Sequence, residues 1–163
     1  MENIAIKNSW NNIPMDIPKK VNILKIAPDL KLFFSEEQYL KLKIGLIPKE
    51  MEDKWFIYYE NDWLHFHRSW TGHEIFHAEI IKENCPDGEY TIKDYFVERN
   101  KEYYNNDNDE YDLNVLLQLI IWGLLGIDIR NHFFDKYDLE DKNSLNIWSD
   151  FGRLMYTKNG KSD

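Results

Sequence analysis

Three runs between residues 54 and 82 constrain the fold of this chain most strongly, because they have the period of two and the residue types of β-strands. The runs cover residues 55–59, 63–70 and 74–82 and are rich in aromatic residues. Two short segments of turn-forming residues, 60–62 and 71–72, separate them. Alternation interrupted by such turns predicts a three-stranded antiparallel meander.

A loop of residues 71–73 would set the register between the second and third runs. Phe66 would then lie opposite Ala78, and Arg68 opposite Phe76. This register gives the sheet one apolar face, formed by Leu64, Phe66, Phe76 and Ile80. It gathers three histidines on the other face: His65, His67 and His77. Arg68 would lie at the end of the apolar face, where a charged group needs a partner.

Two helices are predicted from capping and hydrophobicity. Ser35 and Gln38 have the spacing of a capping box, so a helix should follow them. Residues 113–125 are apolar on nearly all sides, which predicts a buried helix capped by Asp112 or Asn114.

Further elements are less uniquely specified by the sequence. Thr91 can cap a helix over 91–99, and a fourth strand at 90–97 is the alternative. An amphipathic helix is expected at 145–156.

Together these elements predict an α+β fold. A three- to four-stranded antiparallel meander would pack against the buried helix and two or three further helices. The length of 163 residues favours a single domain over 1–163. We expect residues 1–20 to form an arm laid over the body by Trp10 and Ile13, and residues 157–163 to form a disordered tail.

Charge and cysteine content exclude several classes of partner. The formal net charge of -9 argues against long nucleic acids, because their binders carry basic stripes. The single cysteine, Cys85, cannot form an internal disulfide, which fits a reducing compartment. The longest apolar run, 113–127, is too short to cross a bilayer, and no signal-peptide pattern is present. We therefore expect a cytoplasmic protein with no membrane contact.

The turn after the second run carries the strongest candidate binding site. Only four of the 20 Lys and Arg residues are arginines, so an arginine in the most aromatic part of the chain suggests a planar or anionic ligand. Arg68 would grip a phosphate or carboxylate, and a tryptophan face could stack on a base. The candidate ligand-binding residues are Trp63, His65, His67, Arg68, Ser69, Trp70, Thr71, Gly72 and His77. The alternative is structural: Arg68 pairs with a carboxylate and Trp70 packs.

Two further clusters are candidates for chemistry. His65, His67 and His77 could bind a metal ion, with Glu74 or Glu79 as the base of a hydrolase, although strand histidines also occupy half-buried polar faces. Arg130 could reach the hairpin from the loop after the buried helix, or it could complement the C-terminus of that helix. No phosphate-binding loop, dinucleotide fingerprint or nucleophile elbow is present, and no cofactor is expected.

The hairpin residues match the pattern W-F-x-Y followed by L-x-F-H-R-S-W-T-G, which spans Trp55 to Gly72. This pattern resembles one in small bacterial and phage proteins that sometimes lie beside ADP-ribosylglycohydrolase or other ADP-ribose-handling domains. The resemblance implies that residues 68–72 are the functional signature. It also implies an ADP-ribose-type nucleotide or a nucleotide-derived signal as the ligand.

The leading hypothesis is a small-molecule binding protein that sequesters a nucleotide-like anion, an ADP-ribose-type or cyclic nucleotide signal, in a defence or counter-defence setting. The first alternative is an acidic immunity or inhibitor protein, in which the acidic loop 105–112 binds a basic protein partner. The second is a metal-dependent hydrolase. Open edges of the meander would also allow two copies to pair as a homodimer.

Overall fold

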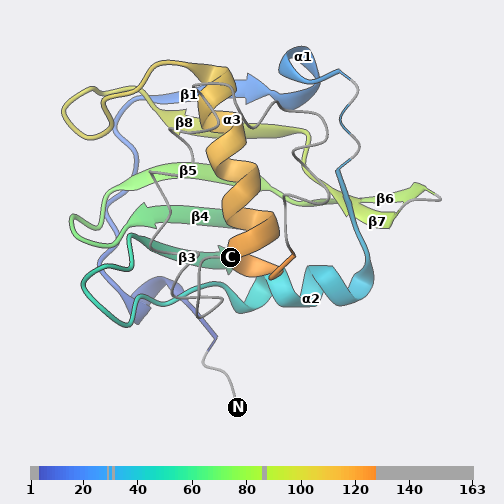
Figure 1. Cartoon of the computed structure of the whole chain (residues 1–163), viewed down its shortest axis with the longest axis horizontal. Coiled ribbons are helices and arrows are strands. Elements are labelled where there is room, and N and C mark those ends of the chain that lie inside the picture. Colours follow the sequence, from blue (N-terminus) through green and yellow to red (C-terminus); the bar gives the residue numbers. More distant parts are fainter. Residues whose placement is uncertain (1–3, 29, 31, 86–87, 128–163) are drawn as a thin grey trace.

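A five-stranded antiparallel sheet forms the centre of the protein (Figure 1), in a computed structural model that describes residues 4–28, 30, 32–85 and 88–127. Its strand order is β1-β8-β5-β4-β3. The strands are β1 (Pro18–Asn22), β8 (Asp94–Glu98), β5 (Glu74–Glu79), β4 (Trp63–Arg68) and β3 (Trp55–Glu60). The predicted meander is β3, β4 and β5, and β8 and β1 extend it by two strands.

A second antiparallel sheet lies beside the first and has the order β2-β7-β6. Its strands are β2 (Phe33–Phe34), β7 (Gly88–Thr91) and β6 (Ile81–Cys85). The fold is therefore α+β as predicted. The prediction of a single sheet of three or four strands was wrong, because the described strands form one sheet of five and one of three. The third predicted run, 74–82, divides at Ile80 between the two sheets.

The helix expected over 91–99 is wrong, and the alternative of a strand is closer. Tyr95 and Val97 alternate with Asp94 and Phe96 in β8, and only the first two are fully buried. The apolar residues that suggested a helix therefore follow a period of two. Pairing of β8 with both β1 and β5 favours the strand over the local helical preference.

The described part of the chain contains three α-helices: α1 (Ile23–Ile26), α2 (Glu36–Ile44) and α3 (Asp109–Gln118). The capping box of α2 is confirmed, because the Gln38 amide donates to the Ser35 hydroxyl oxygen at 3.1 Å and the Ser35 amide donates to the Gln38 side chain at 2.9 Å. The cap predicted for α3 is wrong, since Asn108 caps the helix one turn earlier.

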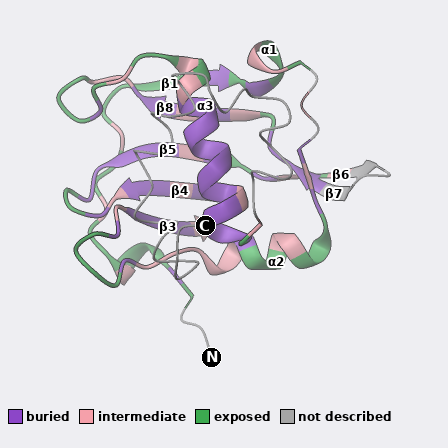
Figure 2. Cartoon of the chain, viewed as in Figure 1, coloured by how far each residue is buried: buried purple, intermediate pink, exposed green. Residues whose placement is uncertain are grey.

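Helix α3 crosses one face of the five-stranded sheet and continues as the π-helix η2 (Leu119–Leu124) (Figure 1). The core lies between this helix and the sheet, where both surfaces are buried (Figure 2). Leu64, Phe66 and Phe76 are fully buried there, and each such side chain contributes about 1.5–3 kcal/mol by leaving water. The prediction of a buried helix against the meander is confirmed.

The register between β4 and β5 differs from the prediction by two residues. Phe66 lies opposite Phe76, and Leu64 opposite Ala78, because the connection between the strands is longer than three residues. A shift of two keeps the side chains of residues 63–66 and 76–79 on their expected faces, whereas Glu74, beyond a register irregularity, changes face. The predicted apolar face and histidine face therefore both exist.

The N-terminal segment contacts the β4–β5 loop. The Trp10 indole donates to the Ser69 carbonyl at 2.7 Å, and the Ile13 amide donates to the Gly72 carbonyl at 2.7 Å. A short 3-10 helix, η1 (Lys7–Ser9), precedes these contacts. The arm is shorter than the predicted 1–20, because β1 begins at Pro18.

Two predicted segments, the helix at 145–156 and the tail at 157–163, lie outside the described residues. None of the helices that the structure describes has the length and apolar character needed to span a bilayer.

Candidate functional site

The loop between β4 and β5 has a fixed conformation that depends on Gly72. Gly72 has a φ of +79°, and a Cβ atom at this position would lie 2.7 Å from the Cβ atom of Asn11. Its amide donates to the Arg68 carbonyl at 2.8 Å. Its carbonyl accepts from Ile13 and from Nδ1 of His67. The glycine thus lets the N-terminal segment pack against the loop.

The predicted donor groups of Ser69 and Gly72 form hydrogen bonds within the protein. The Ser69 hydroxyl donates to the carbonyl of Asp53, and the Gly72 amide is used within the loop. The Thr71 hydroxyl accepts from the His73 amide at 3.1 Å, which leaves its own hydrogen available. Of these three predicted donors, only Thr71 is placed to meet a ligand.

Arg68 lies on the helix-covered side of the sheet, where its guanidinium carbon is 4.5 Å from the ring centroid of Trp55. Among the residues that the structure describes, no carboxylate lies within 4.0 Å of this guanidinium. Arg99 differs, because it forms ion pairs with both Asp109 and Asp112. The structural alternative of an Arg68–carboxylate pair is thus absent from the described part of the chain.

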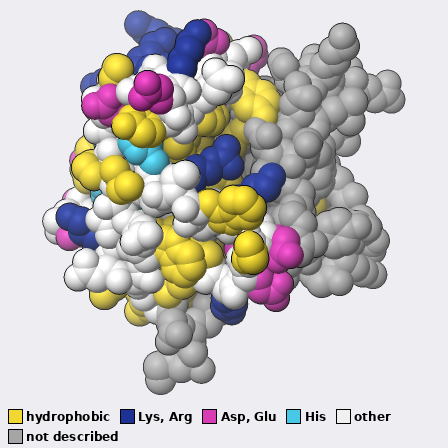
Figure 3. Space-filling view, turned by 90° about the vertical axis from the view of Figure 1, so that its left-hand side faces the viewer, with side chains coloured by type: hydrophobic (Ala, Val, Ile, Leu, Met, Phe, Trp, Pro, Cys, Tyr) yellow, Lys and Arg dark blue, Asp and Glu magenta, His cyan; other side chains and the backbone are white. Residues whose placement is uncertain are grey.

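Arg68 lines a pocket of about 320 Å³ at the end of the sheet. The pocket is formed by Lys54, Arg68, Trp70, Thr71 and Tyr103. Seen from this end, Lys and Arg side chains lie together with hydrophobic side chains around them (Figure 3). Two cations, two aromatic rings and a hydroxyl therefore share one hollow.

The aromatic rings of the pocket are presented in different ways. Trp70 is 74% exposed, and its indole N–H donates to the Met51 carbonyl at 2.6 Å. Tyr103 stacks on His73 with ring centroids 4.0 Å apart. His73 in turn pairs with the buried carboxylate of Glu98 at 2.7 Å. Both rings are thus held by contacts that leave a face for a ligand.

Sequence reasoning missed Lys54 and Tyr103. Lys54 directly precedes β3, and its carbonyl accepts from the Ser69 amide at 2.8 Å. Extending the predicted pairing of the first two runs by one residue would therefore have placed Lys54 beside the loop. Tyr103 comes from the polar segment after β8, and no local pattern in the sequence assigns it to the hairpin.

The predicted histidines and Trp63 form a separate cluster on the opposite face of the sheet. His65 stacks on Tyr58 at 4.7 Å, and Trp63 meets His77 edge to face at 5.1 Å. None of these residues lines the pocket. Arg130 lies outside the described residues. The single predicted cluster is therefore divided into a pocket and a histidine face.

The sequence suggested His67 as a third metal ligand, but it is not part of the cluster that His65 and His77 form. It is buried, and its Nδ1 lies 2.8 Å from the Gly72 carbonyl, so that nitrogen carries the hydrogen and donates it. Burial lowers the pKa of His67, which favours the neutral ring. Glu74 takes its place beside His65 and His77.

Glu74 is the acidic centre of the histidine face. Its Oε2 lies 2.6 Å from Nδ1 of His65 and 3.3 Å from Nδ1 of His77. Burial alone would raise the pKa of this carboxyl group, but the contacts with the two histidines outweigh it and lower the pKa to about 2. Glu74 is therefore ionised at neutral pH.

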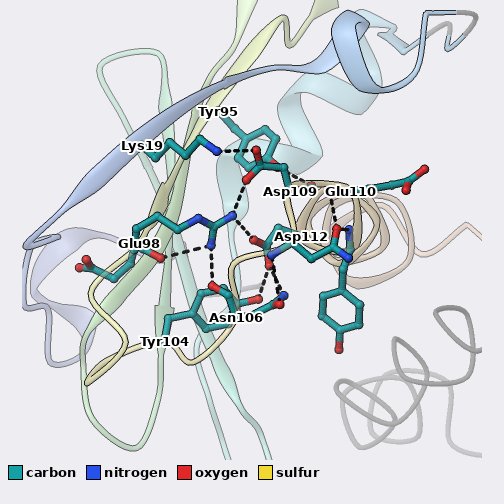
Figure 4. Close-up of polar contacts among 11 residues, drawn as sticks. Lys19, Tyr95, Glu98, Tyr104, Asn106, Asp109, Glu110 and Asp112 are labelled. Carbon is teal, nitrogen blue, oxygen red and sulfur yellow. Dashed lines mark hydrogen bonds and ion pairs between the residues drawn. The ribbon is translucent and has the colours of Figure 1, made fainter.

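Two of the four acidic residues in segment 105–112, Asp109 and Asp112, form contacts within the protein (Figure 4), while Asp107 and Glu110 are exposed. Asp109 pairs with Lys19 at 2.7 Å and with Arg99 at 2.5 Å. Asp112 is fully buried and accepts hydrogen bonds from Arg99, Tyr104 and Asn106. These contacts leave fewer acidic groups for a basic protein partner than the sequence suggests.

Comparison with known proteins gives no further identification, because no family model, curated protein or solved structure matches the chain significantly.

Proposed function

We propose that this protein binds a small nucleotide-like anion in the pocket formed by Lys54, Arg68, Trp70, Thr71 and Tyr103. The observation that carries the proposal is the Arg68 guanidinium, which lines the pocket and has no ion-pair partner among the described residues. A guanidinium without a carboxylate is suited to a phosphate or carboxylate from outside, held through two parallel hydrogen bonds.

The other lining residues suit the remaining parts of such a ligand. Lys54 adds a second positive charge, and Trp70 and Tyr103 offer ring faces on which a base can stack. The charges of Arg68 and Lys54 act on a ligand inside the pocket. Charges farther away than a Debye length of about 8 Å are screened, so the net charge of the whole chain has little effect there.

The size of the pocket favours a ligand with one ring system and one anionic group. Its volume of about 320 Å³ is near the lower end of ligand pockets, which span roughly 300–1,000 Å³. A mononucleotide-sized ligand suits this volume, whereas ADP-ribose or a cyclic dinucleotide would extend beyond it.

The chemistry of the lining favours binding over catalysis. No carboxylate or histidine, the commonest general bases, lines the pocket among the described residues. We therefore propose sequestration of a nucleotide signal in the cytoplasm, in a defence or counter-defence setting, as the hairpin resemblance implies.

Isothermal titration calorimetry tests the proposal. The panel comprises AMP, ADP-ribose, cyclic ADP-ribose isomers and cyclic dinucleotides, each titrated into the full chain. At least one should bind, and Arg68→Ala should abolish the heat while the Tm stays within a few degrees. Lys82→Ala is the matched control, because it removes one positive charge from an exposed position on β6 that does not line the pocket. Absence of heat for every compound, or unchanged binding by Arg68→Ala, would overturn the proposal.

A further inference from the structure

The histidine face of the sheet contains a second cluster that the nucleotide pocket does not use. His65 on β4, Glu74 on β5 and His77 on β5 each offer one ligand atom, and these atoms lie within 4.8 Å of one another. His65 and His77 are direct cross-strand partners, so their side chains lie on the same face of the sheet.

A bulge in β5 explains why Glu74 joins them. Glu74 and His77 are three residues apart, and in a regular strand such residues point to opposite faces. Here Phe66 pairs with Phe76 and His67 pairs with Glu74, so Ile75 is an extra residue on β5. The bulge places Glu74 on the histidine face. Bulges of this kind commonly re-aim a side chain beside a functional site.

The separations are close to those of a metal site. Ligand atoms about 2.0–2.1 Å from a tetrahedral zinc ion lie about 3.4 Å from each other. The distance from Glu74 Oε2 to His77 Nδ1 is 3.3 Å. The distance from the same oxygen to His65 Nδ1 is 2.6 Å, a hydrogen bond that a small turn of the carboxylate would open.

His77 carries an unsatisfied polar atom at the centre of this cluster. Its Nδ1 is buried from solvent, and its contact with Glu74 Oε2 at 3.3 Å does not have hydrogen-bond geometry. A buried nitrogen with so poor a contact is costly, and coordination to a cation would satisfy it.

The surroundings hold the two rings while leaving each of them partly exposed. Tyr58 stacks on His65, and Trp63 and Phe96 contact the ring of His77. The side chains of His65 and His77 are 23% and 22% exposed. The two histidine rings therefore reach the surface, while the carboxylate of Glu74 between them is buried.

We propose that His65, Glu74 and His77 bind a divalent transition-metal ion of the zinc class. Two imidazoles and one carboxylate suit such ions, whereas calcium and magnesium prefer oxygen ligands. Three protein ligands leave at least one position for water or a small ligand, as in open rather than closed zinc sites. The proposal does not depend on the nucleotide pocket.

Calorimetric titration of Zn²⁺ into the chelator-treated full chain, free of any histidine tag, tests the site. One ion should bind per chain. Glu74→Gln should weaken binding more than about 10-fold, since even partners outside the first coordination sphere change affinity by 10–100-fold. Glu79→Gln is the matched control, because it removes the same charge from an exposed position of β5 and should bind as the native chain does. Native-like binding by Glu74→Gln, or no binding by the native chain, would overturn the proposal.

A measurement on the native chain avoids any loss of folding in the variants. Long-range ¹H–¹⁵N spectra report each histidine ring, and Zn²⁺ should shift the ring nitrogens of His65 and His77. His67 should keep its signals, because its Nδ1 remains bonded to Gly72. Shifts confined to other histidines would contradict the assignment.

Discussion

The guanidinium carbon of Arg68 lies 4.5 Å from the ring centroid of Trp55, its cross-strand partner on β3. This cation–π contact holds the guanidinium over the ring without using its five N–H donors. Because Trp55 is buried, the position of the cation is fixed by the core of the sheet. The proposed anion site thus rests on a rigid element, and the loop adds Trp70 and Thr71 beside it.

Replacement of Arg68 by Lys should separate charge from shape. Lysine keeps the positive charge but cannot form two parallel hydrogen bonds or stack as a plane. We expect affinity for a nucleotide that the native protein binds to fall about tenfold or more, in line with a loss of about 1.4 kcal/mol. Calorimetry with the same nucleotide measures this, and equal affinity would show that only the charge matters.

Gly72→Ala should destabilise the protein through both strain and contact. The φ of +79° costs an L-residue about 1–2 kcal/mol, and the new Cβ would meet Asn11 at 2.7 Å. Gly126→Ala is the control, because its φ of +72° is similar while no described residue lies within 4 Å of the added Cβ. Urea denaturation should show a larger loss for Gly72→Ala, and equal losses would contradict a role in packing the N-terminal segment.

Stability should depend on the ionisation of Glu98. Burial would raise the pKa of this carboxyl group, but hydrogen bonds from the Asp16, Ile17 and Asn100 amides and from His73 lower it to about 2 from an ordinary value of 4.5. The ionised form therefore stabilises the fold above pH 4.5, and this contribution is lost as the pH falls toward 2.

The expected loss for Glu98 is about 3 kcal/mol over that range. Urea denaturation at a series of pH values measures it. Glu98→Gln should lower stability at neutral pH and flatten the acid part of the profile. An unchanged slope in this variant would show that other carboxylates control acid unfolding.

Asp112→Ala should be among the most destabilising single substitutions in this protein. It removes a fully buried carboxylate and leaves the Arg99 guanidinium without its second carboxylate, which typically costs about 3–5 kcal/mol. Asp107→Ala removes an exposed partner of Lys101 and should cost less than about 1 kcal/mol. Thermal unfolding of both variants gives the comparison, and similar Tm values would contradict the structural role of Asp112.

The sequence was sufficient for the local features of the fold. Alternation identified β3, β4 and β5, and a capping box identified the start of α2. The two faces of the meander followed from the same alternation, because a register error of two residues preserves them.

Features set by distant contacts could not be predicted in this way. Tyr95 and Val97 fit either a helix or a strand until β1 and β5 pair with them. The bulge at Ile75, which exchanges Glu74 for His67 in the histidine cluster, depends on the full β4–β5 register. Tyr103 is held beside the hairpin by its stacking on His73, a contact between residues 30 positions apart in the sequence.

The most direct test of the central claim is a side-chain NMR titration of the native protein with AMP. The Arg68 Nε–H and Trp70 indole N–H signals should shift together and saturate, while the Trp63 indole signal on the other face of the sheet stays in place. Saturable shifts at Trp63 without any at Arg68, or no shift up to millimolar AMP and ADP-ribose, would contradict a nucleotide-like ligand at this pocket.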